Sequence, residues 1–464
     1  MSYRIEKDSL GEVKVPFESL YGAQTARAVA NFPIGKEKMP VEVIRAYGII
    51  KKAAALANCD QNLLNENKRD YILQAADELI TGKLDQHFPI SLWQTGSGTQ
   101  TNMNVNEVLA NRISQLAGEN PGSKKPVHPN DDVNMSQSSN DTFPAAMAIS
   151  AVKKTEEFLL PVMQELKLEL ISKSEQYAEL LKVGRTHLMD ATPITLGQEF
   201  AAFAAQLEQI IAMVNDSLKY LKQLPLGGTA VGSGLNTKAG FDKLVVKYIN
   251  LETENNYQPA VNKSAAIAAH DSFVNFSGVL KTAAAFFMKL ANDTRWLASG
   301  PRCGIGELNL PKNEPGSSIM PGKVNPTQAE ALFQVAAQVM ANDTAVNIGG
   351  GSGNFQLNVA KPLIIYNILQ SISLLGDAAD SYRKRCLTGI EVNQERLAAY
   401  LEKNLMLVTA LNPITGYDKA AKIAQFAYQE NTSLKEAAVE LGYLTAAEFE
   451  KYVEPQKMTQ PNLE

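Results

Sequence analysis

Three segments of the chain carry a helical pattern that is far longer than an ordinary globular helix. They are residues 143–181, 193–224 and 263–299. A helix of about 35 residues spans roughly 50 Å, whereas helices of globular proteins average about 10–14 residues. The third segment is apolar on more than one face, as in SAAIAAH and VLKTAAAFFMKLA, and a helix that is apolar nearly all round must be buried. The pattern predicts an elongated bundle of long helices that packs against other subunits in a homo-oligomer.

Shorter helical patterns flank the long segments. They cover residues 39–60, 67–81 and 100–117 before them, and 362–385, 393–411, 416–429, 433–441 and 445–452 after them. Glycine and proline interrupt the first 38 residues, which predicts irregular structure there. Because alternating strand patterns are scarce, we predict an all-α fold. Its three expected domains are a mostly helical N-terminal domain (1–138), a central long-helix bundle (139–395) and a small helical C-terminal domain (396–464).

Size and charge narrow the classes of partner. The chain has 464 residues, which exceeds what one compact core usually contains. A net charge of −5 offers no basic field for nucleic acid or an anionic membrane surface. The sequence contains no run of about 18 apolar residues, so no membrane span is predicted. The charged N-terminus lacks a signal segment. Three widely spaced cysteines indicate a reducing compartment, so we expect a cytoplasmic protein.

Four stretches interrupt the helical pattern with glycine, hydroxyl and amide side chains. They are QTGSGTQTNMN (94–104), HPNDDVNMSQSSND (128–141), GRTHLMDATP (184–193) and GSSIMPGKVNP (316–326). Turns and helix caps use the same residue types, so a single such stretch needs no further explanation. Four of them, each beside a long helix, indicate a ligand that accepts many hydrogen bonds.

The GSSIMPGKVNP stretch is not a phosphate loop. The nucleotide motif places four residues between its first glycine and its Gly-Lys pair, and then needs Ser or Thr for magnesium. Here five residues separate Gly316 from Gly322, and Val324 follows Lys323. The GSGTQT and VGSGLN segments also lack the dinucleotide-binding spacing.

The same stretch suits a different anion. Its glycines let backbone amides face a concavity, and Lys323 and Asn325 add a positive charge and an amide donor. A carboxylate is the simplest ligand for such a group. A serine beside a lysine and clustered amides has the setting of a base, which makes Ser317 a hypothetical proton acceptor.

Taken together, these stretches resemble the signature sequences of the fumarase/aspartase superfamily of lyases, and of its class II, cofactor-free fumarases in particular. The resemblance runs over essentially the whole chain and includes GGTAVGSGLN, SGPRCGIGE and LMLVTALNP. It implies an elongated helical homotetramer with a central bundle of long helices. His187 and Gly322 follow the fumarase pattern, whereas aspartases carry glutamine and alanine at these positions.

The resemblance implies the reversible hydration of fumarate to (S)-malate, a citric acid cycle reaction, without cofactor or metal ion. The family reaction is an anti elimination through an aci-carboxylate intermediate, which places a second negative charge beside a carboxylate and therefore needs positive potential. By resemblance, Ser317 removes the C3 proton, while Lys323 and Asn325 stabilise the charge. His187, oriented by Glu330, is the implied acid/base on the departing hydroxyl. The competing interpretation of His187 is a structural histidine. The competing interpretation of Glu330 is a glutamate that the helix dipole favours at the start of a helix.

Carboxylate binding is implied for segments that come from three different subunits in the family. The expected substrate-binding residues are Ser97, Gly98, Thr99, Ser138, Ser139, Asn140, Thr186, Ser318, Lys323, Val324 and Asn325. The HPND stretch matches a secondary anion site of the family, although a capped proline turn explains it equally well. Its candidate residues are His128, Pro129, Asn130 and Asp131. His270 lies amid alanines in a long helical segment and is predicted to be a core residue.

Two other functions stay open at the level of sequence. An aspartate ammonia-lyase belongs to the same superfamily, and a catalytically silent structural member would share the fold. Against the silent alternative, the five expected catalytic positions all carry the expected residue types.

Overall fold

Helices make up most of the computed structural model, which describes residues 2–461, and this confirms the all-α prediction. The longest helices are α7, α10, α11 and α12, with 26, 27, 24 and 25 residues. The α-helices are α1 Ala23–Asn31, α2 Val41–Asp60, α3 Glu66–Ile80, α4 Thr99–Leu116, α5 Ser139–Lys154, α6 Leu160–Gln176, α7 Leu196–Leu221, α8 Phe241–Thr253, α9 Lys263–Ala268, α10 Asp271–Leu297, α11 Thr327–Gly350, α12 Lys361–Arg385, α13 Gln394–Lys403, α14 Asn412–Thr415, α15 Tyr417–Glu430, α16 Leu434–Glu440 and α17 Ala446–Tyr452. Shorter helical turns are η1 Asp85–His87, η2 Pro129–Val133, η3 Thr155–Leu159, η4 Leu387–Gly389, η5 Leu405–Leu411 and η6 Pro455–Thr459.

Short strands form four two-stranded sheets. They are β1 Tyr3–Asp8 with β2 Gly11–Pro16, β3 Leu181–Thr186 with β4 Met189–Thr195, β5 Gln223–Leu224 with β6 Gln258–Pro259, and β7 Leu308–Asn309 with β8 Glu391–Val392. The β5–β6 pair is parallel and the other three are antiparallel.

The chain divides into two units, each built from three separate segments. The first unit comprises Met1–Pro161, Ile210–Ala284 and Val335–Gly376. The second unit comprises Val162–Gln209, Ala285–Gln334 and Asp377–Glu464. Several long helices therefore contribute residues to both units. The division of the sequence into three domains stays a prediction.

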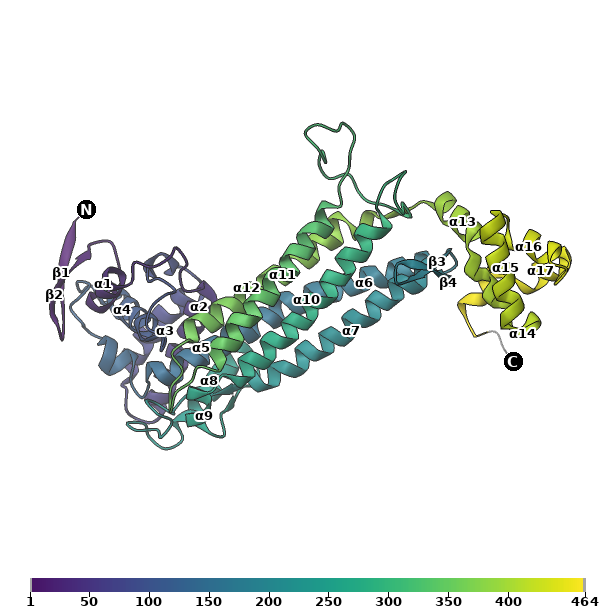
Figure 1. The fold of residues 1–464 in the computed structure, drawn as a ribbon. Coiled ribbons are helices and arrows are strands. Elements are labelled where there is room, and N and C mark those ends of the chain that lie inside the picture. Colours follow the sequence, from purple (N-terminus) through teal and green to yellow (C-terminus); the bar gives the residue numbers. More distant parts are fainter. Residues whose placement is uncertain (1, 462–464) are drawn as a thin grey trace. The chain divides into compact units, whose positions relative to one another are not determined.

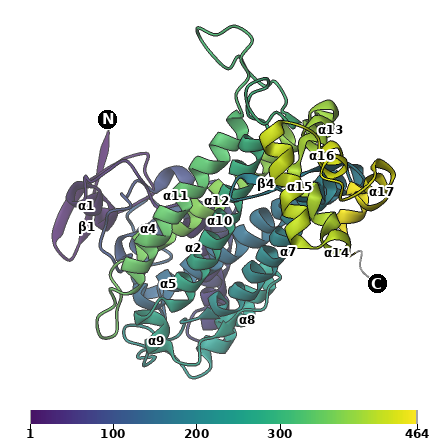
Figure 2. The same ribbon diagram turned by 45° about the vertical axis from the view of Figure 1, so that its right-hand side comes forward.

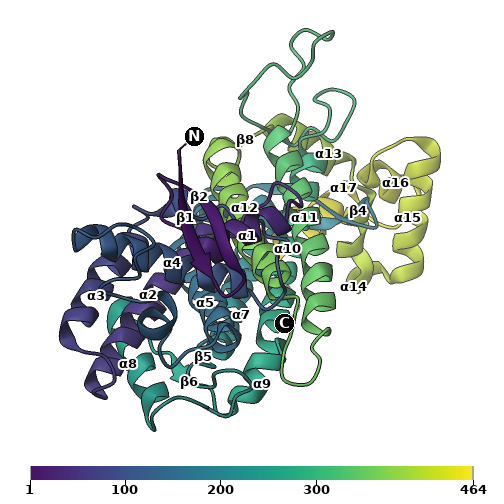
Figure 3. The same cartoon turned by 90° about the vertical axis from the view of Figure 1, so that its left-hand side faces the viewer.

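In the first unit, α2 is the central helix of a helical cluster that also includes α3, α5 and α8. Figure 3 shows the β1–β2 hairpin beside α1, and β5 and β6 near α8 and α9. Tyr47 of α2 is fully buried, and its ring meets Phe143 of α5 edge to face at 6.2 Å. Such aromatic contacts add to the stabilisation from apolar burial, so α2 and α5 are held in one fixed arrangement.

The first unit also contains neighbouring stretches of α10, α11 and α12, which run side by side in Figure 1. Ser277 of α10 donates a 2.8 Å hydrogen bond to Asp343 of α11. Asn342 of α11 donates one at 3.1 Å to Ser371 of α12. These polar contacts are buried. They therefore determine both how each helix is rotated about its axis and which helix it packs against.

The second unit contains the C-terminal helices, which gather in the yellow region of Figure 2. Their core is a cluster around Leu411, Ile423, Ala437 and Phe449. Two of these helices, α16 and α17, start with complete capping boxes at Ser433 and Thr445. Local capping and an independent apolar cluster explain why the sequence predicted α15, α16 and α17 to within one residue of their observed ends.

Four features differ from the sequence-based expectations. The first 38 residues contain the β1–β2 hairpin and α1, not only irregular structure. Pro193 lies in β4 opposite Val183 rather than at a helix start, which an outer strand of a two-stranded sheet permits. The predicted helix 263–299 is broken between α9 and α10, where Ala269 is extended. Helix α8 was not predicted, and α11 was predicted only at its first turn, around Glu330.

No helix within residues 2–461 is long and apolar enough to cross a membrane.

Candidate active site

The predicted carboxylate-binding residues of the first unit lie at the starts of two helices. Ser97 and Gly98 precede α4, and the hydroxyls of Ser97 and Thr99 are 2.8 Å apart. Gly98 has a φ of 77°, and a Cβ at this position would lie 2.0 Å from the ring of Phe143 in α5. Only glycine therefore allows α4 to begin this close to α5. The free N–H groups of a helix start suit an anion.

Ser138, Ser139 and Asn140 form the matching start of α5. Ser138 caps the helix by accepting a hydrogen bond from the backbone of Asn140, and Asp141 completes a capping box. Asp141 is completely buried and also accepts hydrogen bonds from the backbone N–H groups of Gly227 and Thr229, at 3.1 and 2.9 Å. Burial raises the pKa of Asp141 to about 7 against the effect of these donors.

A buried lysine ties the two helix starts together. Lys51 of α2 donates hydrogen bonds to the side-chain oxygens of Asn102 (2.9 Å), Asn134 (3.1 Å) and Gln137 (2.9 Å). Asn102 of α4 in turn donates to the hydroxyl of Ser139 in α5 at 3.2 Å. Burial lowers the pKa of Lys51 to about 7, and Asp141 opposes the shift. This network links the first turn of α4 to the start of α5. That residues 97–99 and 138–140 bind a carboxylate stays a prediction.

His187 stands at the tip of a hairpin in the second unit. It forms the two-residue turn between β3 and β4 together with Leu188, and the two φ angles are 57° and 61°. Two left-handed residues in succession define a type I′ turn, which normally prefers Asn and Gly. Both residues and Thr186 are exposed. The turn lacks the Asn-Gly or Asp-Gly pair that favours this backbone, and Leu188 in particular is of a type that is rarely left-handed. Strain of this kind concentrates at functional sites.

Buried charges support the base of that hairpin. Glu307 is fully buried and lies 2.7 Å from the guanidinium of Arg185 and 3.2 Å from the ammonium of Lys182. Lys182 also lies 2.9 Å from Glu199. A buried ion cluster is costly to disrupt once its partners are in place, so the hairpin is anchored although its tip is exposed.

The GSSIMPGKVNP loop closes on itself at its two ends. The N–H of Gly316 donates to the carbonyl of Lys323 at 3.0 Å, and the side-chain amide of Asn325 donates to the carbonyl of Gly316. A Cβ at Gly316 would lie 2.4 Å from that Lys323 carbonyl, which explains the glycine. Gly322 has a φ of 81°. Ser318, Lys323 and Val324 are exposed on this loop.

Ser317 sits in a favourable setting for carrying negative charge. Its hydroxyl oxygen accepts hydrogen bonds from the backbone N–H groups of Ile319 (3.3 Å) and Met320 (3.0 Å). Donors aimed at an oxygen favour its deprotonated form. Glu330 lies in the first turn of α11 and is half-buried. It makes no hydrogen bond or ion pair with His187 within the described residues of this chain.

The HPND stretch forms the start of η2. The ring Nδ1 of His128 accepts hydrogen bonds from the backbone N–H groups of Asn130 and Asp131, at 3.2 and 3.1 Å. An accepting Nδ1 carries no proton, so its 3.2 Å approach to the Asp131 carboxylate is not an ion pair. The observed structure is the capped turn that sequence reasoning held as the alternative, and an anion site here stays a prediction.

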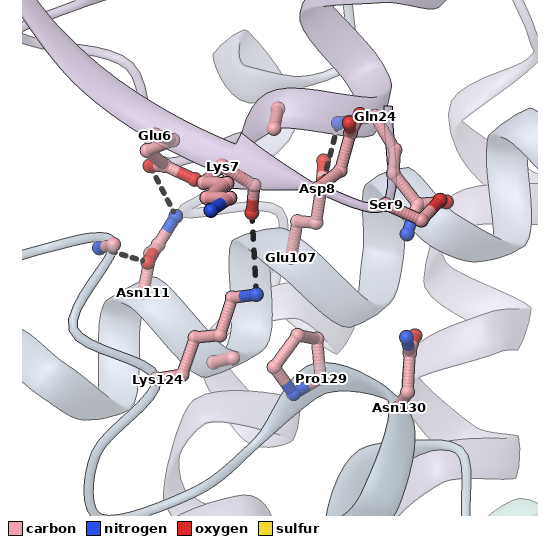
Figure 4. A pocket seen from close by; sticks show the side chains of 13 residues that line it. Glu6, Lys7, Asp8, Ser9, Gln24, Glu107, Asn111, Lys124, Pro129 and Asn130 are labelled. Carbon is pink, nitrogen blue, oxygen red and sulfur yellow. Dashed lines mark hydrogen bonds between the residues drawn. The ribbon is translucent and has the colours of Figure 1, made fainter. Parts of the chain in front are cut away.

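A cavity of about 370 Å³ lies beside this stretch in the first unit (Figure 4). Pro129 and Asn130 reach its edge, and Lys124 donates across it to the carbonyl of Lys7 at 3.3 Å. The carboxylates of Glu6, Asp8 and Glu107 also line it. These three carboxylates outnumber the two lysines of the lining, Lys7 and Lys124, so the cavity is a poor match for a dicarboxylate, which like charge repels. No group of three or more His, Cys, Asp or Glu within residues 2–461 is placed to hold a metal ion.

Comparisons with known proteins show the family of this chain. A family model described as lyase matches residues 11–341, and one described as the C-terminus of fumarase C matches residues 407–460. The chain therefore belongs to this lyase family.

Several of its relatives at more than 50% identity are named fumarate hydratase. The chain is 58% identical to a class II fumarate hydratase of Thermosynechococcus vestitus, over 97% of this chain and 96% of the relative. It is 53% identical to the mitochondrial fumarate hydratase of Homo sapiens, over 99% and 90%. The crystal structure of a class II fumarase from Schistosoma mansoni matches with a TM-score of 0.96 and 41% identity, covering 100% of both chains.

Sequence reasoning missed the buried charges behind the site. Lys51, Lys361 and Asp141 are all completely buried in the first unit, and none was a candidate. A signal existed for Lys51, because it lies in the otherwise apolar run YGIIKKAAALA, where a helix with few polar positions must bury some of them.

Proposed function

We propose that this chain is a hydro-lyase that interconverts fumarate and (S)-malate. The observation that carries this conclusion is the close identity with fumarate hydratases along nearly the whole chain. The polar loops described above are consistent with it, since they offer hydroxyl, amide and lysine donors suited to carboxylates. No feature favours an aspartate ammonia-lyase or a silent structural protein.

In the proposed mechanism, Ser317 takes the C3 proton of malate as its oxyanion form. The two N–H groups that face its oxygen support that form. Lys323 and Asn325, at the other end of the same loop, stabilise the aci-carboxylate charge. His187 then supplies a proton to the departing hydroxyl through a bound water, the general acid–base role that histidine fills most often.

The substrate carboxylates are held, in this proposal, by the helix starts at 97–99 and 138–140 together with Thr186 and the 318–325 part of the loop. Because Glu330 does not contact His187 within one chain, the proposed pairing of the two occurs between subunits. We accordingly propose a homotetramer with active sites shared between subunits. A cytoplasmic location is proposed as well, and the three unpaired cysteines support a reducing compartment.

One experiment tests the function against its alternatives. The purified protein is incubated separately with (S)-malate and with aspartate, and the absorbance of fumarate is followed. We expect absorbance to rise with malate only, and to fall when fumarate is the starting compound. A rise with aspartate alone would assign an ammonia-lyase, and no change with either substrate would leave the structural role.

A further inference from the structure

Lys361 occupies an unusual position in the first unit. It is completely buried, and its ammonium has no hydrogen-bond acceptor among the residues that the structure describes. It is the first residue of α12, and its backbone N–H donates to the carbonyl of Gly96 at 3.2 Å. A Cβ at Gly96 would lie 1.3 Å from the carbonyl oxygen of Val359. The start of α12 is therefore pressed against the residue that precedes Ser97.

The charged groups that interact with Lys361 come from two other elements. Asp141 of α5 attracts its ammonium, and His270, at the break between α9 and α10, is affected by it. Asp141 also attracts the ammonium of Lys51 of α2. Burial lowers the pKa of Lys361 to about 7, and that of His270 to about 3 with a further contribution from Lys361. The group thus holds two lysines, one aspartate and a neutral histidine.

Two lysines with one carboxylate leave an excess of positive charge in the interior. An ammonium without an acceptor is expensive to bury. A methionine would fill a similar volume without that cost, so Lys361 lowers the stability of the isolated chain. Proteins usually keep a destabilising residue of this kind at a functional site, so Lys361 is expected to serve a function.

The nearby ligand-binding groups provide such a use. Ser97, Thr99, Ser138, Ser139 and Asn140 are all neutral donors, whereas the proposed substrate carries two negative charges. The starts of α4, α5 and α12 add only partial positive charge. These groups lack a charged donor behind the 96–99 segment, which Lys361 supplies in its protonated form.

We propose that Lys361 is a positioning residue that places a buried positive charge behind the 96–99 segment and thereby favours binding of one substrate carboxylate. It acts through the backbone of Gly96 and the groups of Ser97 and Thr99, without touching the substrate. The inference rests on the proposed function, because the ligand is the dicarboxylate of that reaction.

The test is Lys361→Met, with Lys83→Met as the matched control. Lys83 is an exposed lysine of the first unit, so the control removes the same charge from the surface. Binding is measured by calorimetry with succinate, a dicarboxylate that lacks the reacting groups, and turnover is measured with malate. We expect Lys361→Met to keep or raise the thermal midpoint of unfolding. Its dissociation constant for succinate and its KM should rise about tenfold or more, with a smaller change in kcat.

The outcomes separate this inference from the proposed function. Wild-type protein that neither binds succinate nor converts malate would refute the proposed function itself. An active wild type with a Lys361→Met variant that binds succinate equally well would overturn only the role of Lys361. Lys361→Gln serves as a second neutral variant if the methionine variant does not fold. Failure of both to fold would make Lys361 a structural residue and would also overturn the inference.

Discussion

Ser317 shows how a residue in an exposed loop can be prepared for chemistry. Two backbone N–H groups face its oxygen, so the hydroxyl contributes little to the core but is set to carry charge. We expect Ser317→Ala to lower kcat with malate by about 10²–10⁴-fold, the range of general acid–base catalysis. The thermal midpoint should not change. Ser352→Ala, in another exposed loop, is the control, and a Ser317→Ala rate near that of this control would exclude Ser317 as the base.

Lys51 differs from Lys361 in having all its hydrogen bonds made. Lys51→Met would leave the oxygens of Asn102, Asn134 and Gln137 without their shared donor. We expect the free energy of unfolding to fall by about 2–5 kcal/mol. The neighbouring Lys52→Met removes only partly exposed ion pairs with Asp77 and Glu252 and should cost about 0–1 kcal/mol. Chemical denaturation measures both, and equal losses would contradict a special role for Lys51.

The buried His270 should make the stability of the folded chain sensitive to acid. Burial holds its pKa at about 3 in the folded chain, against about 6.5 when unfolded. The unfolded chain therefore binds a proton that the folded chain excludes, and stability is lost as the pH falls below 6.5. At pH 5.5 the loss is about 1.4 kcal/mol.

The nearly isosteric His270→Phe removes this proton-binding group. Both ring nitrogens lack partners within residues 2–461, and the ring stacks on Phe273 at 5.6 Å, so phenylalanine should fit without cost at pH 7.5. Its loss of unfolding free energy between pH 7.5 and 5.5 should be smaller than that of the wild type by about the same 1.4 kcal/mol. Parallel pH profiles for the two proteins would show that His270 is not the sensitive group.

At the scale of elements, a substitution in the turn of the β3–β4 hairpin should affect stability and activity in different directions. Asparagine tolerates the left-handed backbone of position 187 better than histidine, since its short polar side chain bonds locally. We expect His187→Asn to keep or slightly raise the thermal midpoint while kcat falls by about 10²-fold or more. His187→Val is the contrasting variant, because a β-branched side chain opposes this φ. Equal stability in the two variants would mean that the turn is not strained as described.

The elements that sequence reasoning found and missed differ in what determines them. Helices such as α3 and α16 carry their caps and periodicity locally, so the pattern was sufficient. The β3–β4 hairpin could not be predicted from GRTHLMDATP, because the stretch lacks the Asn-Gly or Asp-Gly pair of a two-residue turn and the anchoring Glu307 is distant in sequence. The break before α10 has no glycine or proline, and only the buried environment of His270 distinguishes it.

The candidate site was also predicted only in part. The polar stretches were visible as departures from the helical pattern, and Asn102 of α4 donates a hydrogen bond to Ser139 of α5. Their role in carboxylate binding stays a prediction. The buried lysines were missed: the apolar run around Lys51 indicated a buried charge, but the sequence did not show that Lys361 is buried.

At the scale of the whole molecule, the separated catalytic groups predict complementation between inactive variants. His187 and Glu330 make no contact within one chain, so the proposed tetramer would build each site from several subunits. Ser317→Ala and His187→Asn should each be nearly inactive alone. Co-expressed with different affinity tags and purified as mixed oligomers, they should recover activity, since random assembly leaves about a quarter of the sites with both wild-type residues. The control mixes the two variants after separate purification, where intact homo-oligomers should stay inactive. Mixed oligomers without recovered activity would place His187 and Ser317 of each site on one subunit.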